Sequence, residues 1–205
     1  MNSNMHKRTY TLTNRARQAA ENDRNILEAA AALWREIPIH EISLERIAEK
    51  SGVTVRTILR KFGNKEELFS ACIKNDAASI MKARDQTPAG DMSCILNDLL
   101  AEYEASGDAV IRTLSAEQEV SIAREILASG RAYHRAWCTR VFKGFLPNPK
   151  TKNYTTRLMS FVAATDVYLW KLLRKDLNHS EKQTRAVMQE LLEGLISNNK
   201  PLKMI

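Results

Sequence analysis

The sequence predicts an all-α protein in two parts, a three-helix N-terminal domain that contains a helix-turn-helix and a larger helical domain behind it. Apolar residues recur at three- and four-residue spacing along most of the 205 residues, and no segment alternates as a strand would. Only 7 Gly and 5 Pro interrupt the chain, so long helices can form. We expect the first domain at residues 1–68 and the second at residues 69–205.

The chain begins with a polar, basic stretch, residues 1 to about 20, which we expect to be a mobile arm. Its four positive charges come from Lys7, Arg8, Arg15 and Arg17. The first helix is predicted from about Asp23 to Glu36, and Pro38 ends it because the residue before a proline is biased away from helical geometry.

The stretch SLERIAEKSGVTVRTILRKF, residues 43–62, has the pattern of two short helices joined at a tight turn. Ser43 and Thr54 are suitable N-caps, since a hydroxyl oxygen can accept from the first free amides of a helix. Gly52 can adopt the positive φ that the turn requires, and Ala48 is small where the helices cross. These features together predict a helix-turn-helix.

The second helix of this motif, about Thr54 to Lys61, is basic and carries no acid. Together with Lys65 it presents four cations, and residues 54–65 contain no carboxylate. Such a helix can enter a DNA major groove and face phosphates. The alternative is a solvated basic face on an ordinary helical hairpin. The N-terminal arm, residues 1 to about 20, either reaches an adjacent minor groove or is only disordered.

Further helices are expected along the rest of the chain. The next one begins at Asn64, whose side chain can cap it with Glu67 three residues on, and continues to about Ala83. The remaining expected helices are Met92–Ser106, Asp108–Leu114, Ala116–Leu127, Arg131–Phe145, Tyr154–Leu177 and Glu181–Ile196.

The last two of these helices, about 154–177 and 181–196, are the most strongly patterned. Apolar residues form two adjacent columns, which is more than one intramolecular face needs. We therefore expect a homodimer in which this helix pair meets its twin about a two-fold axis. The alternative is one ordinary packed core helix.

Composition limits the class of protein. The net charge is +7, and +5 of it lies in residues 1–65, which hold 12 Lys and Arg against 7 Asp and Glu; this balance suits a polyanionic partner. The three cysteines, Cys72, Cys94 and Cys138, form no paired motif, and no apolar run is long enough to cross a membrane. We expect a cytoplasmic protein without a membrane partner.

Motifs for catalysis are missing from the sequence. No Gly-rich phosphate loop, HExxH or nucleophile elbow occurs. His134 and Cys138 stand one helical turn apart, but no third ligand or orienting acid lies near them in sequence. We therefore expect no enzyme activity, no cofactor and no metal site.

Residues 24–69 resemble the DNA-binding domain of the TetR family of transcriptional regulators. The segments ILEAAAALWRE, SLERIAEKSGVTVRTILRKF and NKEELF carry this resemblance. It implies contact with double-stranded operator DNA through Thr54, Val55, Arg56, Thr57, Arg60 and Lys61, with Ser43 and Lys65 on phosphates. Arg56 also suits bidentate contact with guanine or phosphate on chemical grounds, and Lys61 and Lys65 suit point-charge contacts. Leu59 stands where the family commonly has tyrosine, so it either contacts a thymine methyl or has no contact.

In the family, the larger domain holds an inducer pocket, and ligand binding shifts the helix after the DNA reader, here Asn64–Ala83. The candidates for a pocket in this chain are Tyr103, Tyr133, His134, Trp137, Cys138, Phe142, Phe161, Asp166, Tyr168 and Trp170. Ordinary core packing is the alternative for each of them. No particular small-molecule effector follows from the sequence.

The function expected from these features is sequence-specific DNA binding by a dimeric transcriptional regulator, a repressor that a small molecule releases from its operator. One alternative is an activator or a regulator that needs no ligand. Another is a helical protein-interaction adaptor whose helix-turn-helix is only structural. Salt-dependent binding to duplex DNA separates the adaptor from the regulators.

Overall fold

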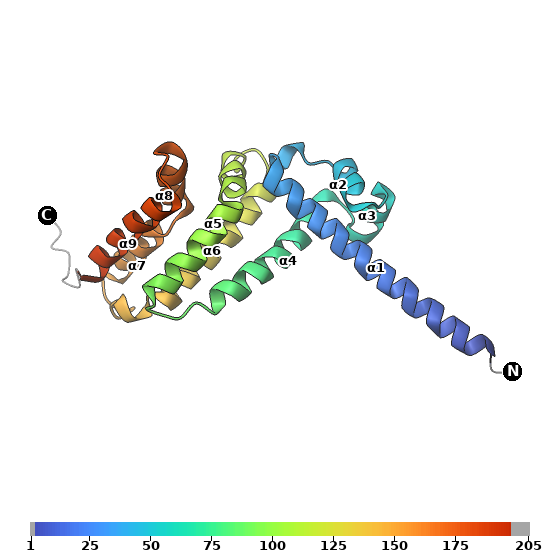
Figure 1. Ribbon diagram of the computed structural model, residues 1–205, viewed down its shortest axis with the longest axis horizontal. Coiled ribbons are helices and arrows are strands. Elements are labelled where there is room, and N and C mark those ends of the chain that lie inside the picture. Colours follow the sequence, from blue (N-terminus) through green and yellow to red (C-terminus); the bar gives the residue numbers. More distant parts are fainter. Residues whose placement is uncertain (1–2, 198–205) are drawn as a thin grey trace. The chain divides into compact units, whose positions relative to one another are not determined.

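Helices make up the described part of the protein, which we analyse from a computed structural model (Figure 1). The backbone is described for residues 3–197, and the side chains for the same range except residues 3–15, 73–74, 76–81 and 83. No strand occurs within this range, so the all-α fold class is confirmed. The chain divides into two compact units, Met1–Asp76 and Ala77–Ile205, and the division falls inside one helix, α4 (Lys65–Asp85).

The first unit is built from α1 (Ser3–Glu36), the short 3-10 helix η1 (Ile39–Glu41), α2 (Leu44–Ser51), α3 (Val55–Phe62) and the beginning of α4. Its core is formed by fully buried apolar side chains, among them Ile26, Ala30, Ile47, Ile58 and Leu68. Asn64 caps α4 as predicted, since its Oδ1 accepts from the amide of Glu67 at 2.7 Å.

The first helix is longer than its predicted range, Asp23–Glu36. A mobile arm was expected up to about residue 20, but α1 is helical from Ser3 onwards, and only residues 1 and 2 of the expected arm lie outside the described range. The physical reason is that neither Gly nor Pro occurs between Ser3 and Glu36, so nothing in the sequence stops the helix.

The second unit contains α5 (Met92–Ser115), α6 (Ser121–Val141), η2 (Lys143–Phe145), α7 (Tyr154–Ala164), α8 (Val167–Lys171), the π-helical turn η3 (Leu172–Asp176) and α9 (Glu181–Ser197). Aromatic side chains from several of these elements meet in its core. Phe142 and Phe161 stack with ring centroids 4.3 Å apart, and Trp137 meets Phe142 edge-on at 6.3 Å.

Two predicted helix breaks are wrong. Gly107 was expected to separate two helices, but α5 passes through it; similarly, Ser129 and Gly130 lie inside α6. At Gly107 the reason is a close approach: a Cβ there would lie 2.5 Å from the Trp170 ring, so only glycine admits the indole. The expected start of a helix at Ala116 is also wrong, because a turn precedes Ser121.

The predicted single helix Tyr154–Leu177 is divided into α7, α8 and η3. Thr165 ends α7, with its hydroxyl donating to the carbonyl oxygen of Phe161 at 2.7 Å. Asp166 then starts α8, because its carboxylate accepts from the amide of Tyr168 at 2.9 Å.

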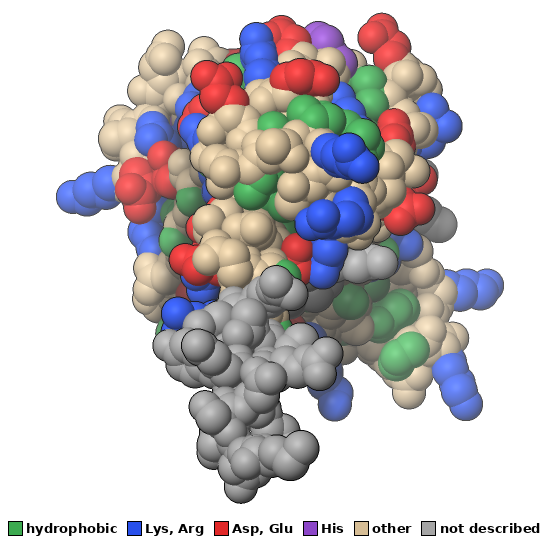
Figure 2. All heavy atoms as spheres, turned by 90° about the vertical axis from the view of Figure 1, so that its right-hand side faces the viewer, with side chains coloured by type: hydrophobic (Ala, Val, Ile, Leu, Met, Phe, Trp, Pro, Cys, Tyr) green, Lys and Arg blue, Asp and Glu red, His purple; other side chains and the backbone are tan. Residues whose placement is uncertain are grey.

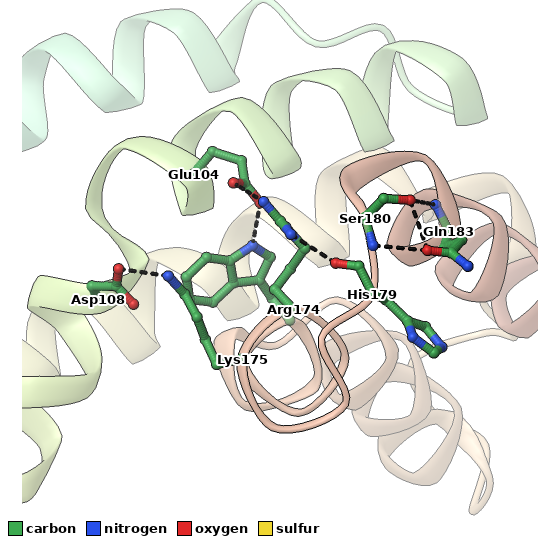
Figure 3. A network of polar contacts seen from close by, with 8 residues as sticks. Glu104, Asp108, Arg174, Lys175, His179, Ser180 and Gln183 are labelled. Atoms are coloured by element: carbon green, nitrogen blue, oxygen red, sulfur yellow. Dashed lines mark hydrogen bonds and ion pairs between the residues drawn. The ribbon is translucent and has the colours of Figure 1, made fainter.

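Polar contacts fasten η3 to α5 (Figure 3). The Glu104 carboxylate accepts from Nε and Nη2 of Arg174, at 2.6 and 2.7 Å, and from the indole N–H of Trp170 at 2.8 Å. Lys175 reaches Asp108 at 2.7 Å. Hydrogen bonding from Arg174 holds the pKa of Glu104 below its usual range. The network therefore fixes the segment between α8 and α9 on the surface of α5.

Candidate nucleic-acid interface

The turn between α2 and α3 has the geometry that the sequence predicts. Ser43 accepts from the amide of Arg46 at 3.3 Å, and Thr54 accepts from the amide of Thr57 at 3.2 Å. Gly52 has φ 69°, and its amide donates to the Glu49 carbonyl oxygen at 3.3 Å. Caps and turn together fix the direction of α3.

Helix α3 separates an apolar face from a cationic one. Ile58 is fully buried and points into the first unit. Arg56 and Arg60 lie one turn apart on the opposite side of the helix and are exposed. Within the part of the chain that the structure describes, neither has a carboxylate partner. Both guanidinium groups are therefore open to an anionic partner.

The other two cations of the segment are engaged inside the first unit. Lys61 pairs with Asp23 of α1 at 2.5 Å. Lys65 donates to the carbonyl oxygen of Ile39 at 3.3 Å, and partial burial lowers its pKa. A contact between Lys61 and DNA would have to compete with Asp23, a partner 38 residues away that the local sequence pattern does not indicate.

Three of the four uncharged residues of the predicted interface make hydrogen bonds within the first unit. The hydroxyls of Ser43 and Thr54 serve as helix caps, and Thr57 shares a hydrogen bond of 3.0 Å with Thr54. Val55 is half-buried at the start of α3.

Two further exposed side chains belong to this surface. Arg46 projects from α2 and Leu59 from α3, both into solvent. Figure 2 shows Lys and Arg side chains near the middle of one face, with Asp and Glu side chains around them. The exposed arginines Arg46, Arg56 and Arg60 suit a polyanionic partner.

The predicted pocket residues lie in or beside the core of the second unit. Six of the ten are buried there: Tyr103, Trp137, Cys138, Phe142, Phe161 and Trp170. Tyr133 and His134 are half-buried, Asp166 caps α8, and Tyr168 is 59% exposed. A surface hollow of about 310 Å³ lies near Tyr168, lined also by Ile111, Leu114, Ser115, Lys171 and Asp176.

A polar cluster surrounds His134 inside the second unit. Arg84 is only 3% exposed, pairs with Glu102 at 2.5 Å and contacts His134 Nδ1 at 3.2 Å. Because a guanidinium only donates, Nδ1 is the accepting nitrogen and the neutral ring carries its proton on Nε2, 3.1 Å from the Thr165 hydroxyl. Burial, together with the charge of Arg84, lowers the pKa of His134 to about 4.

These surroundings oppose a cysteine nucleophile. Cys138 Sγ lies 3.7 Å from His134 Nε2, but burial raises the thiol pKa to about 11, so the thiol stays protonated near neutral pH. A thiolate–imidazolium pair would need the opposite pKa shifts in both groups. Among the side chains that the structure describes, no three of His, Cys, Asp and Glu gather closely enough to hold a metal ion.

The fold and this surface define a helix-turn-helix protein with a second, larger helical unit. Residues 26–72 match the model of a family described as bacterial regulatory proteins, tetR family. The match covers the helix-turn-helix and lies wholly in the first unit, and the resemblance to the TetR family is thereby confirmed.

Solved structures of transcriptional regulators share the fold. A proposed transcriptional regulator from Pseudomonas aeruginosa PAO1 is 16% identical with a TM-score of 0.64, covering 86% of this chain and 90% of its own. A transcriptional regulator from Rhodococcus sp. RHA1 is 14% identical with a TM-score of 0.63, covering 87% and 96%. A TetR transcriptional regulator from the same organism is 18% identical with a TM-score of 0.51, covering 88% and 98%.

No curated protein matches the chain. Among the described residues, no helix has the length and apolar character needed to cross a membrane.

Proposed function

We propose that this protein is a sequence-specific, DNA-binding transcriptional regulator that works as a homodimer. The observation that carries the proposal is the outward face of α3, where Arg56 and Arg60 are exposed on a helix without acids. The match to the TetR family over residues 26–72 supports the same function.

In this proposal Arg56 reads a base and most of its neighbours hold the backbone. The guanidinium can donate two parallel hydrogen bonds to a guanine edge in the major groove, which specifies sequence. Arg60, Lys61 and Lys65 contact phosphates through their positive charges. Val55 and the hydroxyls of Ser43, Thr54 and Thr57 complete the proposed contact surface.

The dimer is proposed to form through residues 154–177 and 181–196. Four large apolar side chains in this region are exposed in the single chain: Tyr168, Leu172, Leu177 and Leu191. Exposed apolar side chains that form one surface favour burial against a partner, and the proposal places these four on such a surface. A two-fold dimer places two copies of α3 on successive half-sites about 34–36 Å apart and gains affinity from both.

Repression and release by a small molecule complete the proposal. A protein bound near a promoter blocks polymerase, so repression is the simplest consequence of DNA binding. The protein would be cytoplasmic, because the operator DNA lies in the cytoplasm. A ligand bound among the aromatic residues around Trp137 and Phe161 switches the protein only if it binds the DNA-incompetent state more tightly.

Binding of the purified protein to the intergenic DNA beside its own gene, compared with a shuffled duplex at two salt concentrations, tests this function. We expect a preference for the native fragment at both salts, and loss of that preference in Arg56→Ala. Arg135→Ala is the matched control, because it removes one exposed arginine from α6 instead. Absence of salt-dependent binding to any duplex would support the adaptor function instead.

Lys65→Ala separates positioning from base reading in the same assay. Because a lysine on a phosphate carries no sequence information, we expect weaker binding to every duplex and a salt slope smaller by about one. Since Lys65 also donates to Ile39, the thermal stability of the variant must be measured alongside. An equal loss on all sequences for Arg56→Ala would contradict its assignment as the base reader.

A further inference from the structure

Leu59 is an apolar side chain exposed on the cationic face of the first unit. Its exposed fraction is 42%. Among the described residues, the other exposed large apolar side chains are Tyr168, Leu172, Leu177 and Leu191, all in the second unit. Leu59 is therefore the member of this set that belongs to the first unit, on the helix proposed to contact DNA.

Leu59 is not part of the buried core of the first unit. Ile58 is the fully buried residue of α3, whereas Leu59 projects beside it toward solvent. The backbone carbonyl of Leu59 accepts from Gly63 at 2.9 Å, a contact that any residue type can make. A polar residue would satisfy the helix equally well and would avoid leaving apolar area in water.

The neighbours of Leu59 place it beside the groups proposed to contact DNA. Arg60 follows it directly, and Arg56 precedes it by one helical turn. A leucine cannot hydrogen-bond to a phosphate or to the polar atoms of a base edge. In the major groove, the apolar group that a base pair displays is the C5-methyl of thymine.

We propose that Leu59 is a specificity-determining residue that packs against the C5-methyl group of a thymine next to the base pair contacted by Arg56. This inference rests on the proposed function and adds one element of the operator, a thymine in each half-site. Contact excludes water from both apolar surfaces, and the loss of one buried methyl corresponds to roughly a fourfold loss of affinity.

Replacement of thymine by deoxyuridine tests this contact, because it removes only the methyl group. Duplexes that bind the full chain are first selected from a random library. Each thymine of the selected site is then replaced singly by deoxyuridine, and binding is measured by fluorescence anisotropy for the wild type, Leu59→Ala and Leu59→Met.

We expect one thymine in each half-site at which deoxyuridine weakens wild-type binding roughly fourfold. Leu59→Ala should bind the thymine and deoxyuridine duplexes equally, whereas Leu59→Met, which keeps an apolar side chain, should retain most of the difference. Alanine at this exposed helical position should not impair folding. We therefore expect all three proteins to fold alike.

The two ways of failing are distinct. If a sequence is selected but no thymine shows a methyl effect that depends on Leu59, the inference is overturned and the proposed function stands. If no sequence is selected at all, the proposed function fails, and the inference fails with it. A partner protein that covers Leu59 would belong to the second outcome.

Discussion

His134 is a half-buried histidine whose ring is held neutral by its surroundings. Arg84 donates to Nδ1, and the guanidinium charge and the burial both oppose protonation of the ring. A second proton would have to sit on Nδ1, facing a cation. The pKa of about 4 in the folded chain therefore lies well below the ordinary value of 6.5.

The depressed pKa predicts a stability that falls with acidity. Between pH 6.5 and about pH 4 the unfolded chain binds a proton at His134 and the folded chain does not, so the free energy of unfolding decreases as the pH is lowered through that window. The loss attributable to His134 is on the order of 3 kcal/mol by pH 4. Urea unfolding across this range measures it.

His134→Gln supplies the control, because an amide can accept from Arg84 and donate to Thr165 without titrating. Glu102 acts in the opposite direction: burial raises its pKa, so it favours the folded chain as the pH falls. The difference between wild type and His134→Gln removes that contribution. Parallel pH curves for the two proteins would show that His134 is not held neutral.

At the scale of single residues, the sequence shows which side chains are basic, but it does not show which of them bind partners inside the protein. Arg56, Lys61 and Lys65 stand in one short segment, and their types gave no reason to separate them. The separation comes from Asp23 and from the Ile39 carbonyl, both far away in sequence. Such pairings depend on how α1 and η1 pack, which local patterns do not encode.

At the scale of elements, two glycines inside helices have different roles. Gly107 of α5 faces the Trp170 ring, and an alanine methyl there would have to occupy space already filled by the indole. Gly107→Ala should therefore lower the free energy of unfolding by about 1–3 kcal/mol, measured by chemical denaturation. The same substitution should cost much less in a Trp170→Leu background, where the ring is gone.

Gly130 of α6 is the matched control. It also lies inside a helix, but nothing stands within 4 Å of a Cβ added there, and the residue is exposed. Gly130→Ala should stabilise the protein by about 0.5–1 kcal/mol, because alanine loses less backbone freedom on folding. A stabilising Gly107→Ala would mean that the indole is not packed against α5.

Element boundaries were predictable where the signal is local. Thr54 and Asn64 accept from amides three residues further along, and Gly52 forms the turn through its own positive φ, so these three predictions were confirmed. Thr165 and Asp166 carried a similar signal, since both are suitable capping residues, but the apolar period on either side hid it. The passage of α5 through Gly107 depends on Trp170, which no local pattern indicates.

At the scale of the whole molecule, most of the predicted pocket is core. Phe142 contacts both Trp137 and Phe161 in the second unit, and Tyr103 donates to the Thr165 carbonyl oxygen at 2.8 Å. Sequence spacing predicted that these aromatic residues share an interior. Binding of a ligand in that interior stays a prediction, because apolar residue types alone do not distinguish a filled core from a binding site.

The exposed apolar residues of the second unit lead to a prediction about assembly. Leu191 is 45% exposed on α9, whose buried side is formed by Met188 and Leu192. If this surface joins two copies, Leu191→Glu places a charge in the interface, and the desolvation of that charge opposes association. We expect the variant to sediment as a monomer at micromolar concentration and to lose affinity for operator DNA, because the two half-sites are then bound independently.

Ala186→Glu introduces the same charge on the same helix at an exposed position, beside the exposed polar residues Gln189, Glu190 and Glu193. We expect this control to remain dimeric and to bind DNA as the wild type does. If Ala186→Glu dissociates the dimer and Leu191→Glu does not, the interface lies on the other side of α9. A dimer that survives both substitutions would place the interface outside α9, and the exposed leucine would then need a partner other than a second copy.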